Sequence, residues 1–186
     1  MRILKTVFTI AGSSFLFAFP LPAQSRVTNC DRSLGLADME HISSKGRLQD
    51  AGAPQTRRIV ALGKNAIPLL IACLRDETKT KMSVVDFWPS TRVGDIAFFY
   101  LCDLFTDSTW EHSTIDGVVT WKTVEAEYPG SPSWTAWYQF VEKHGRKYVQ
   151  NAWSKKWKEE ESDIIWDEKE QCFKLGRPPT QGDVRP

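Results

Sequence analysis

The stretch Arg57-Arg-Ile-Val-Ala-Leu-Gly-Lys-Asn-Ala-Ile-Pro-Leu-Leu-Ile-Ala-Cys-Leu-Arg-Asp76 decides how the chain folds. Its first part closes an apolar helical face, and Gly63 then provides a position where a helix can end in the left-handed conformation. Asn65 follows as a candidate N-cap. Pro68 falls early in the next helix, where its missing N–H costs least. The stretch therefore predicts two short helices with a tight turn between them, which turn back on each other.

Two apolar stripes predict helices that pack in the core. The first occupies positions i, i+3, i+4 and i+7 of the second short helix: Ile67, Leu70, Ile71 and Leu74. The second continues for about three turns and is the clearest amphipathic pattern in the chain: Val93, Ile96, Ala97, Tyr100, Leu101 and Leu104. Thr91 is the expected cap of this longer helix, and Asp95 suits the positive pole at its start.

The segments Ala61-Leu62-Gly63, Ala66-Ile67-Pro68-Leu69-Leu70 and Leu74-Arg75-Asp76 resemble a HEAT-type repeat. The resemblance covers about residues 57–105, one full repeat and the first helix of another. It implies paired antiparallel helices that form a scaffold or binding surface, and it carries over no catalytic residue. A stable array needs about three repeats, and no third repeat is recognisable.

The rest of the chain completes an expected all-α fold, in which the HEAT-like hairpins are followed by a C-terminal helical segment. We expect an earlier helix over residues 34–48 and an irregular loop over 106–130, with a possible short strand at Val118-Val-Thr-Trp121. Ser131-Pro132 marks the start of the C-terminal segment. Gly145 within it either stops a helix or only bends it.

Residues 1–23 have the pattern of a secretory signal peptide. Arg2 and Lys5 form a basic start, a mostly apolar and uncharged run follows, and Ala23 offers a small residue for cleavage. The apolar run is shorter than the about 20 residues that a membrane helix needs. We therefore expect a secreted or periplasmic product that has no membrane span once the leader is cleaved.

The mature chain is expected to be one helical domain over residues 24–175, followed by a flexible tail over 176–186. The whole chain has 24 basic and 23 acidic residues. Because the leader contains two basic residues and no acidic one, 22 basic residues remain against 23 acidic ones. This balance argues against a nucleic-acid partner, which usually requires a strong basic excess.

The four cysteines allow three pairings in an exported protein. Cys30 and Cys172 lie near the two ends of the mature chain, and our hypothesis is that their disulfide joins those ends. Cys73 and Cys102 either pair with each other or remain buried thiols. No two cysteines have the spacing of a zinc ligand pair, so we expect no metal and no other cofactor.

Seven of the eight tryptophans lie in the second half of the chain, and Trp88 lies just before its midpoint. Most of them should be core residues. Trp134 and Trp137 fall on a helical stripe and are expected to be buried. Trp110 and Trp121 are flanked by polar loop residues. They are candidates for an exposed platform that binds a protein, a peptide or a glycan, with core packing as the alternative.

Polar residues add two weaker candidates for a site. Asp86, Arg92 and Asp95 flank Trp88 and form either a polar site or a structural ion pair. His112 lies between Glu111 and Asp116, and a carboxylate beside a histidine can orient it as a general base. A surface polar cluster is the alternative. The candidate ligand-binding residues are thus Trp88, Arg92, Trp110, His112 and Trp121.

No nucleophile elbow, phosphate loop or zinc-protease motif is present in the sequence. The favoured function is therefore an exported, non-catalytic binding or interaction module with no assigned catalytic residue. A cell-envelope hydrolase that uses the histidine and carboxylates of residues 110–116 is the alternative. A structural envelope protein without a specific ligand is a third possibility.

Overall fold

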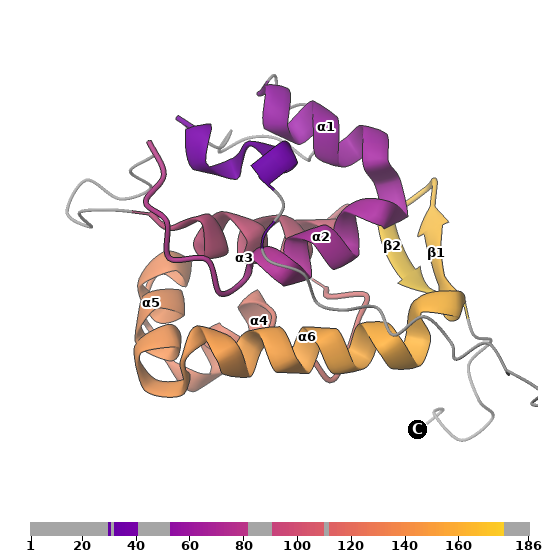
Figure 1. Cartoon of the computed structure of the whole chain (residues 1–186). Helices are drawn as coiled ribbons and strands as arrows, with labels where there is room; N and C mark the ends of the chain where they lie inside the picture. Colours follow the sequence, from indigo (N-terminus) through magenta and orange to yellow (C-terminus); the bar gives the residue numbers. More distant parts are fainter. Residues whose placement is uncertain (1–29, 31, 41–52, 82–90, 110–111, 177–186) are drawn as a thin grey trace, which may run out of the picture.

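The computed structural model describes residues 30, 32–40, 53–81, 91–109 and 112–176. These ranges contain six α-helices, four short 3-10 helices and one antiparallel pair of strands (Figure 1). In chain order they are η1 Arg32–Leu34, η2 Leu36–Asp38, α1 Pro54–Leu62, η3 Gly63–Asn65, α2 Ala66–Cys73, α3 Val93–Leu104, α4 Trp121–Glu127, α5 Ser133–His144, α6 Arg146–Glu160, η4 Glu161–Asp163, β1 Ile164–Asp167 and β2 Cys172–Leu175. The expected leader, Trp88, Trp110 and all but the first residue of the expected tail lie outside the described residues.

The two consecutive helices predicted from the opening stretch are α1 and α2. Gly63 follows α1 with a φ of 53°, in the region that favours glycine. The turn differs in detail from the prediction, because Asn65 keeps helical dihedral angles and its side chain makes no capping bond. The 3-10 helix η3 joins α1 to α2 instead. Membership of a HEAT repeat stays a prediction.

The centre of the molecule is formed by α2 and α3, which pack directly against each other. Figure 1 shows α1 above this pair and α6 below it. Both predicted apolar stripes are confirmed as core, since every member is buried, and Leu70 and Leu101 have no exposed surface. Burial of such stripes, rather than intrinsic helix propensity, provides most of the stability of short helices.

The fold is mostly helical but not all-α, because residues 164–175 form a β-hairpin. Ile164 pairs with Leu175 and Trp166 with Phe173. The rings of this second pair lie edge to face, with centroids 5.0 Å apart. Such cross-strand aromatic pairs stabilise antiparallel strands, which explains why the segment pairs with itself after α6 ends.

Two local predictions were wrong. The expected strand at 118–121 is absent: Val118 and Val119 are buried without strand pairing, and Trp121 begins α4, with Thr120 as its N-cap. The helix expected over 34–48 is replaced, in its described part, by η1 and η2, which are separated by Gly35 in the left-handed conformation. Residues 41–48 lie outside the described residues.

Gly145 stops the helix rather than bending it. Its φ of 77° and ψ of 150° lie in a region that side chains disfavour, and they separate α5 from α6. The second of these helices therefore returns past the end of α2, where the Gln150 amide donates to the carbonyl oxygens of Ile71 and Ala72 at 2.9 and 3.1 Å. These bonds cap the end of α2, where the Ile71 carbonyl oxygen also accepts from the Leu74 backbone N–H at 3.3 Å.

The disulfide joins Cys30 to Cys73, so the predicted Cys30–Cys172 pairing was wrong. Cys73 is the last residue of α2, and the turns η1 and η2 follow Cys30 close to that part of the core. Cys172 instead begins β2 in the hairpin, where it is buried as a free thiol, as is Cys102. Burial raises the pKa of both thiols and keeps them unreactive.

A buried carboxylate connects three helices. Asp95, in the first turn of α3, has no exposed surface and accepts hydrogen bonds from the Arg92 backbone N–H at 2.7 Å and from Trp137 Nε1 of α5 at 2.7 Å. The Arg146 guanidinium of α6 donates to the same carboxylate at 2.5 Å. A buried carboxylate is stable only when it is paired in this way.

The Arg146 side chain reaches this carboxylate over Gly94 and is itself only 10% exposed. A Cβ atom at Gly94 would lie 2.5 Å from the Leu74 carbonyl oxygen and 2.8 Å from a guanidinium nitrogen. The guanidinium also lies 5.9 Å from the centre of the Trp137 ring, within the range of a cation–π contact. Glycine is therefore required where α3 approaches the end of α2.

The disulfide gives the first prediction. Replacing Cys30 with serine should lower the free energy of unfolding by about 2–4 kcal/mol, because the 43-residue separation closes a long loop in the unfolded chain. Urea unfolding of both proteins measures the loss, and Cys172→Ala should keep the disulfide. Peptide mapping that recovers Cys30 joined to Cys172 would contradict the observed pairing.

The buried carboxylate gives the second prediction. Asp95→Ala should destabilise the protein by about 3–5 kcal/mol, because Arg146 would be left buried without its counter-ion. The matched control is Asp116→Ala at an exposed carboxylate, expected within about 0.5 kcal/mol of wild type. Equal unfolding midpoints for the two variants would show that the carboxylate does not join the helices.

Candidate functional site

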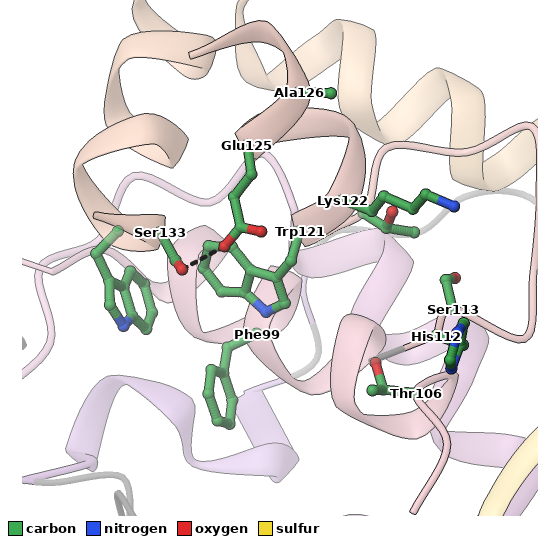
Figure 2. A pocket seen from close by; sticks show the side chains of 11 residues that line it. Phe99, Thr106, His112, Ser113, Trp121, Lys122, Glu125, Ala126 and Ser133 are labelled. Atoms are coloured by element: carbon green, nitrogen blue, oxygen red, sulfur yellow. Dashed lines mark hydrogen bonds between the residues drawn. The ribbon is translucent and has the colours of Figure 1, made fainter. Parts of the chain in front are cut away.

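A groove of about 700 Å³ opens between α4, the start of α5 and the loop that follows α3 (Figure 2). Four of its lining residues are aromatic or apolar and seven are polar. They are Phe99, Trp121, Ala126 and Trp134, together with Thr106, His112, Ser113, Thr120, Lys122, Glu125 and Ser133. The volume is in the range of small-molecule binding sites, which combine apolar surfaces with a few polar groups.

Three half-buried aromatic rings form one side of the groove. Trp121 and Trp134 lie nearly perpendicular, with ring centroids 5.3 Å apart. Phe99 is parallel to Trp134, with centroids 6.0 Å apart. Phe98 lies edge to face with Trp121 at 4.9 Å, and it stacks on the fully buried Trp137 at 3.7 Å. The core thus supports the aromatic surface from behind.

Polar groups of α4 and α5 meet above these rings. Ser133 donates a hydrogen bond to the Glu125 carboxylate, and this bond links the two helices across the groove (Figure 2). Lys122 lies one helical turn before Glu125 on α4, and both side chains are exposed. Because their charges are opposite, this part of the groove has no net charge.

His112 lies at the other end of the groove with Asp107 as its partner. Its Nδ1 is 3.0 Å from the Asp107 carboxylate, and the ring is 69% exposed. The carboxylate expected from the sequence was Glu111 or Asp116. Glu111 lies outside the described residues, and Asp116 is exposed. The bridge between Thr106 and Ser113 closes the loop and brings Asp107 to the ring.

Of the five residues predicted from the sequence, the structure brings two into the groove, His112 and Trp121. Arg92 lies elsewhere, where its guanidinium donates to the Glu77 carbonyl oxygen at 3.1 Å. The ion partner of Asp95 is Arg146, while Arg92 contributes only its backbone N–H to that carboxylate, and Asp86 lies outside the described residues. Trp88 and Trp110 lie outside the described residues.

Sequence reasoning missed the α5 side of the groove. Trp134 was expected in the core but is only half-buried, because it is the second residue of α5 and reaches the surface there. The Ser131-Pro132 start signal was available and placed Trp134 in the first turn. Phe99 was missed because it lies between core positions of α3 and has no motif of its own.

The helices that frame the groove are joined by an ion cluster at their far ends. Glu127 of α4 lies 2.7 Å from Lys143 Nζ and 2.8 Å from His144 Nε2, both on α5. Hydrogen bonds from Lys143 and His144 lower the pKa of the Glu127 carboxyl below its ordinary 4.5, and the carboxylate raises the pKa of Lys143. The cluster joins the end of α4 to the end of α5 at the surface.

A second groove of about 690 Å³ lies between α1, the end of α3 and the β-hairpin, and it contains none of the residues predicted from the sequence. Its walls are mostly apolar: Ile59, Val60, Gly63, Lys64, Leu104, Trp166, Glu168, Gln171 and Phe173. Gln171 has a φ of 55°, which is unusual for a residue with a side chain. Polar groups that would orient a ligand are fewer than in the first groove.

Among the described residues, no group of three or more histidine, cysteine, aspartate or glutamate side chains is arranged to hold a metal ion. In the same part of the chain, none of the helices has the length and apolar character needed to cross a bilayer.

No protein family, no curated protein and no solved structure matches the chain. The geometry of the groove is therefore the basis for any functional conclusion.

The ion cluster predicts a pH-dependent stability. Because the pKa of Glu127 is lower in the folded protein, its contribution is complete above pH 4.5 and is lost as the pH falls through the folded-state value. Glu127→Gln should lower the melting temperature slightly near neutral pH, and the difference from wild type should shrink below pH 4.5. Melting temperatures measured from neutral pH to below pH 4.5 test this prediction. The control is Glu142→Gln, which replaces an exposed carboxylate of α5. A difference that stays constant with pH would contradict the assignment.

Proposed function

We propose that the protein is an exported, non-catalytic binding or interaction module whose ligand site is the groove between α4 and α5. The observation that carries the proposal is the aromatic surface of Phe99, Trp121 and Trp134 facing polar groups in a cavity of about 700 Å³. Exposed tryptophan faces are costly in water, and tryptophan is enriched where proteins bind partners.

The support behind the rings favours binding without rearrangement. Trp121 contacts Phe98, which stacks on Trp137, and the indole of Trp137 is hydrogen-bonded to the buried Asp95. A surface fixed in this way loses little conformational entropy when a ligand settles on it. The groove is therefore preorganised on its aromatic side.

The signal-peptide pattern and the Cys30–Cys73 disulfide support export to an oxidising compartment. The resemblance of residues 57–105 to a HEAT-type repeat supports a scaffold or binding role. In such an arrangement, the helical hairpins would position the groove rather than line it. Among the described residues of that range, only Phe99, from its last helix, contributes to the lining of the groove.

The proposal predicts ligand-dependent stabilisation that requires Trp121. We expect some members of a panel of sugars, peptides and metal salts to raise the melting temperature of the mature protein (residues 24–186). A ligand present at 100 times its Kd adds about 2.7 kcal/mol to the free energy of unfolding. Trp121→Ala should weaken that binding about 30-fold, corresponding to about 2 kcal/mol for a central aromatic contact. The matched control is Trp166→Ala in the second groove, which should leave binding unchanged. Equal loss in both variants, or no stabilisation by any compound, would count against the groove.

A cell-envelope hydrolase is the second candidate, and the contact between His112 and Asp107 favours it. A carboxylate on Nδ1 orients the ring so that Nε2 can accept a proton from water. The two candidates differ in their response to His112→Asn. A hydrolase would release soluble fragments from purified cell-wall polymer and lose that activity in the variant. A binding module would release no fragments in either form.

A further inference from the structure

We infer that the groove binds a neutral oligosaccharide, whose sugar rings lie on Trp121 and Trp134 while its hydroxyl groups contact the polar wall. The inference rests on the proposed binding function and narrows it to one ligand class. Three features of the groove support it: its charge balance, the orientation of its aromatic rings and the mixture of its hydrogen-bonding groups.

The charge balance favours a neutral ligand. Lys122 and Glu125 both line the groove, and they have opposite charges. His112 at the far end is paired with the Asp107 carboxylate. A cationic ligand would be attracted by Glu125 and repelled by Lys122, and an anionic ligand would meet the reverse, so these two lining charges favour neither sign. Proteins that attract a charged ligand usually line the site with charges of the opposite sign, and this groove has no such lining.

The aromatic rings present the kind of surface that a sugar ring covers. A pyranose has an apolar face of C–H groups, and the negative face of an indole attracts such weakly positive hydrogens. Trp121 and Trp134 lie at 70° to each other with centroids 5.3 Å apart, so they form two walls of a corner rather than one flat plane. Successive sugar units of a bent chain can each contact one of these walls.

The polar wall offers both donors and acceptors. Lys122 donates and Glu125 accepts. The hydroxyl groups of Ser133, Thr106 and Ser113 donate to the Glu125 carboxylate and to the carbonyl oxygens of Cys102 and Ile115, so toward a ligand they act as acceptors. Sugar hydroxyls also donate and accept, so each can replace a water on this wall without leaving a polar group unpaired. An apolar side chain seated on this wall would bury the charges of Lys122 and Glu125 without offering them a hydrogen bond.

The test uses the full mature protein with 15N-labelled tryptophan and follows the indole N–H signals by NMR. The probes are cellotetraose, maltotetraose and the tetramer of N-acetylglucosamine, compared with tetramethylammonium chloride and the acetylated, amidated peptide Ala-Leu-Ala-Leu. Trp121→Phe and Trp134→Phe assign the two groove signals. Trp137 and Trp153 are internal controls, because their indoles donate to Asp95 and to the Val119 carbonyl oxygen inside the core.

The expected result is that at least one oligosaccharide shifts the Trp121 and Trp134 signals in a saturable way, while Trp137 and Trp153 stay unchanged. Because the ligand is neutral, 0.5 M salt should not change its affinity for the groove. For the same reason, Glu125→Gln should change the affinity less than tenfold. Removing the ring in Trp121→Ala should weaken it more than tenfold.

Two other outcomes are distinguishable. If tetramethylammonium or the peptide shifts the groove signals and no oligosaccharide does, the oligosaccharide inference is overturned while the groove remains a binding site. If no probe shifts Trp121 or Trp134, the inference is overturned and the proposed function loses its support at this groove.

Discussion

The structure depends on one carboxylate that is completely buried. Asp95 brings together three helices that are far apart in the sequence, because it accepts hydrogen bonds from the start of α3, from Trp137 of α5 and from Arg146 of α6. Removing any one partner would leave a buried polar or charged group unsatisfied. This requirement fixes the positions of α5 and α6 relative to α3 more narrowly than apolar packing alone would, since apolar contacts are not directional.

The hydrogen bonds of Asp95 also influence the groove, because α5 contributes residues to both. Trp134 precedes Trp137 by three residues, so the two indoles lie on the same side of the helix. Trp137 is anchored in the core by Asp95 and by stacking on Phe98, while Trp134 extends to the surface beside Trp121. The buried ion pair therefore helps to place the half-buried indole of Trp134. The aromatic rings of core and groove form one continuous set of contacts.

The sequence predicted the helical core well and the site only in part. Apolar stripes with helical spacing identify buried faces directly, and both stripes of α2 and α3 are core. The disulfide and the hairpin depend on which partner a residue meets in the folded chain. The sequence around Cys30 or Trp166 does not indicate that partner. Trp121 and His112 were recognisable from their polar neighbours. Phe99 was not, because it lies between core positions of α3. Trp134 was expected in the core, although the Ser131-Pro132 signal placed it in the first turn of its helix.

The most direct measurement is hydrogen exchange of the Trp137 indole N–H. If Asp95 joins α3, α5 and α6 as described, this proton is sequestered, and it should exchange only when the whole protein unfolds. Its protection should then equal the global free energy of unfolding and fall in step with it as urea is added. Exchange within seconds under native conditions, or protection that is independent of global stability, would show that the carboxylate does not hold the helices together.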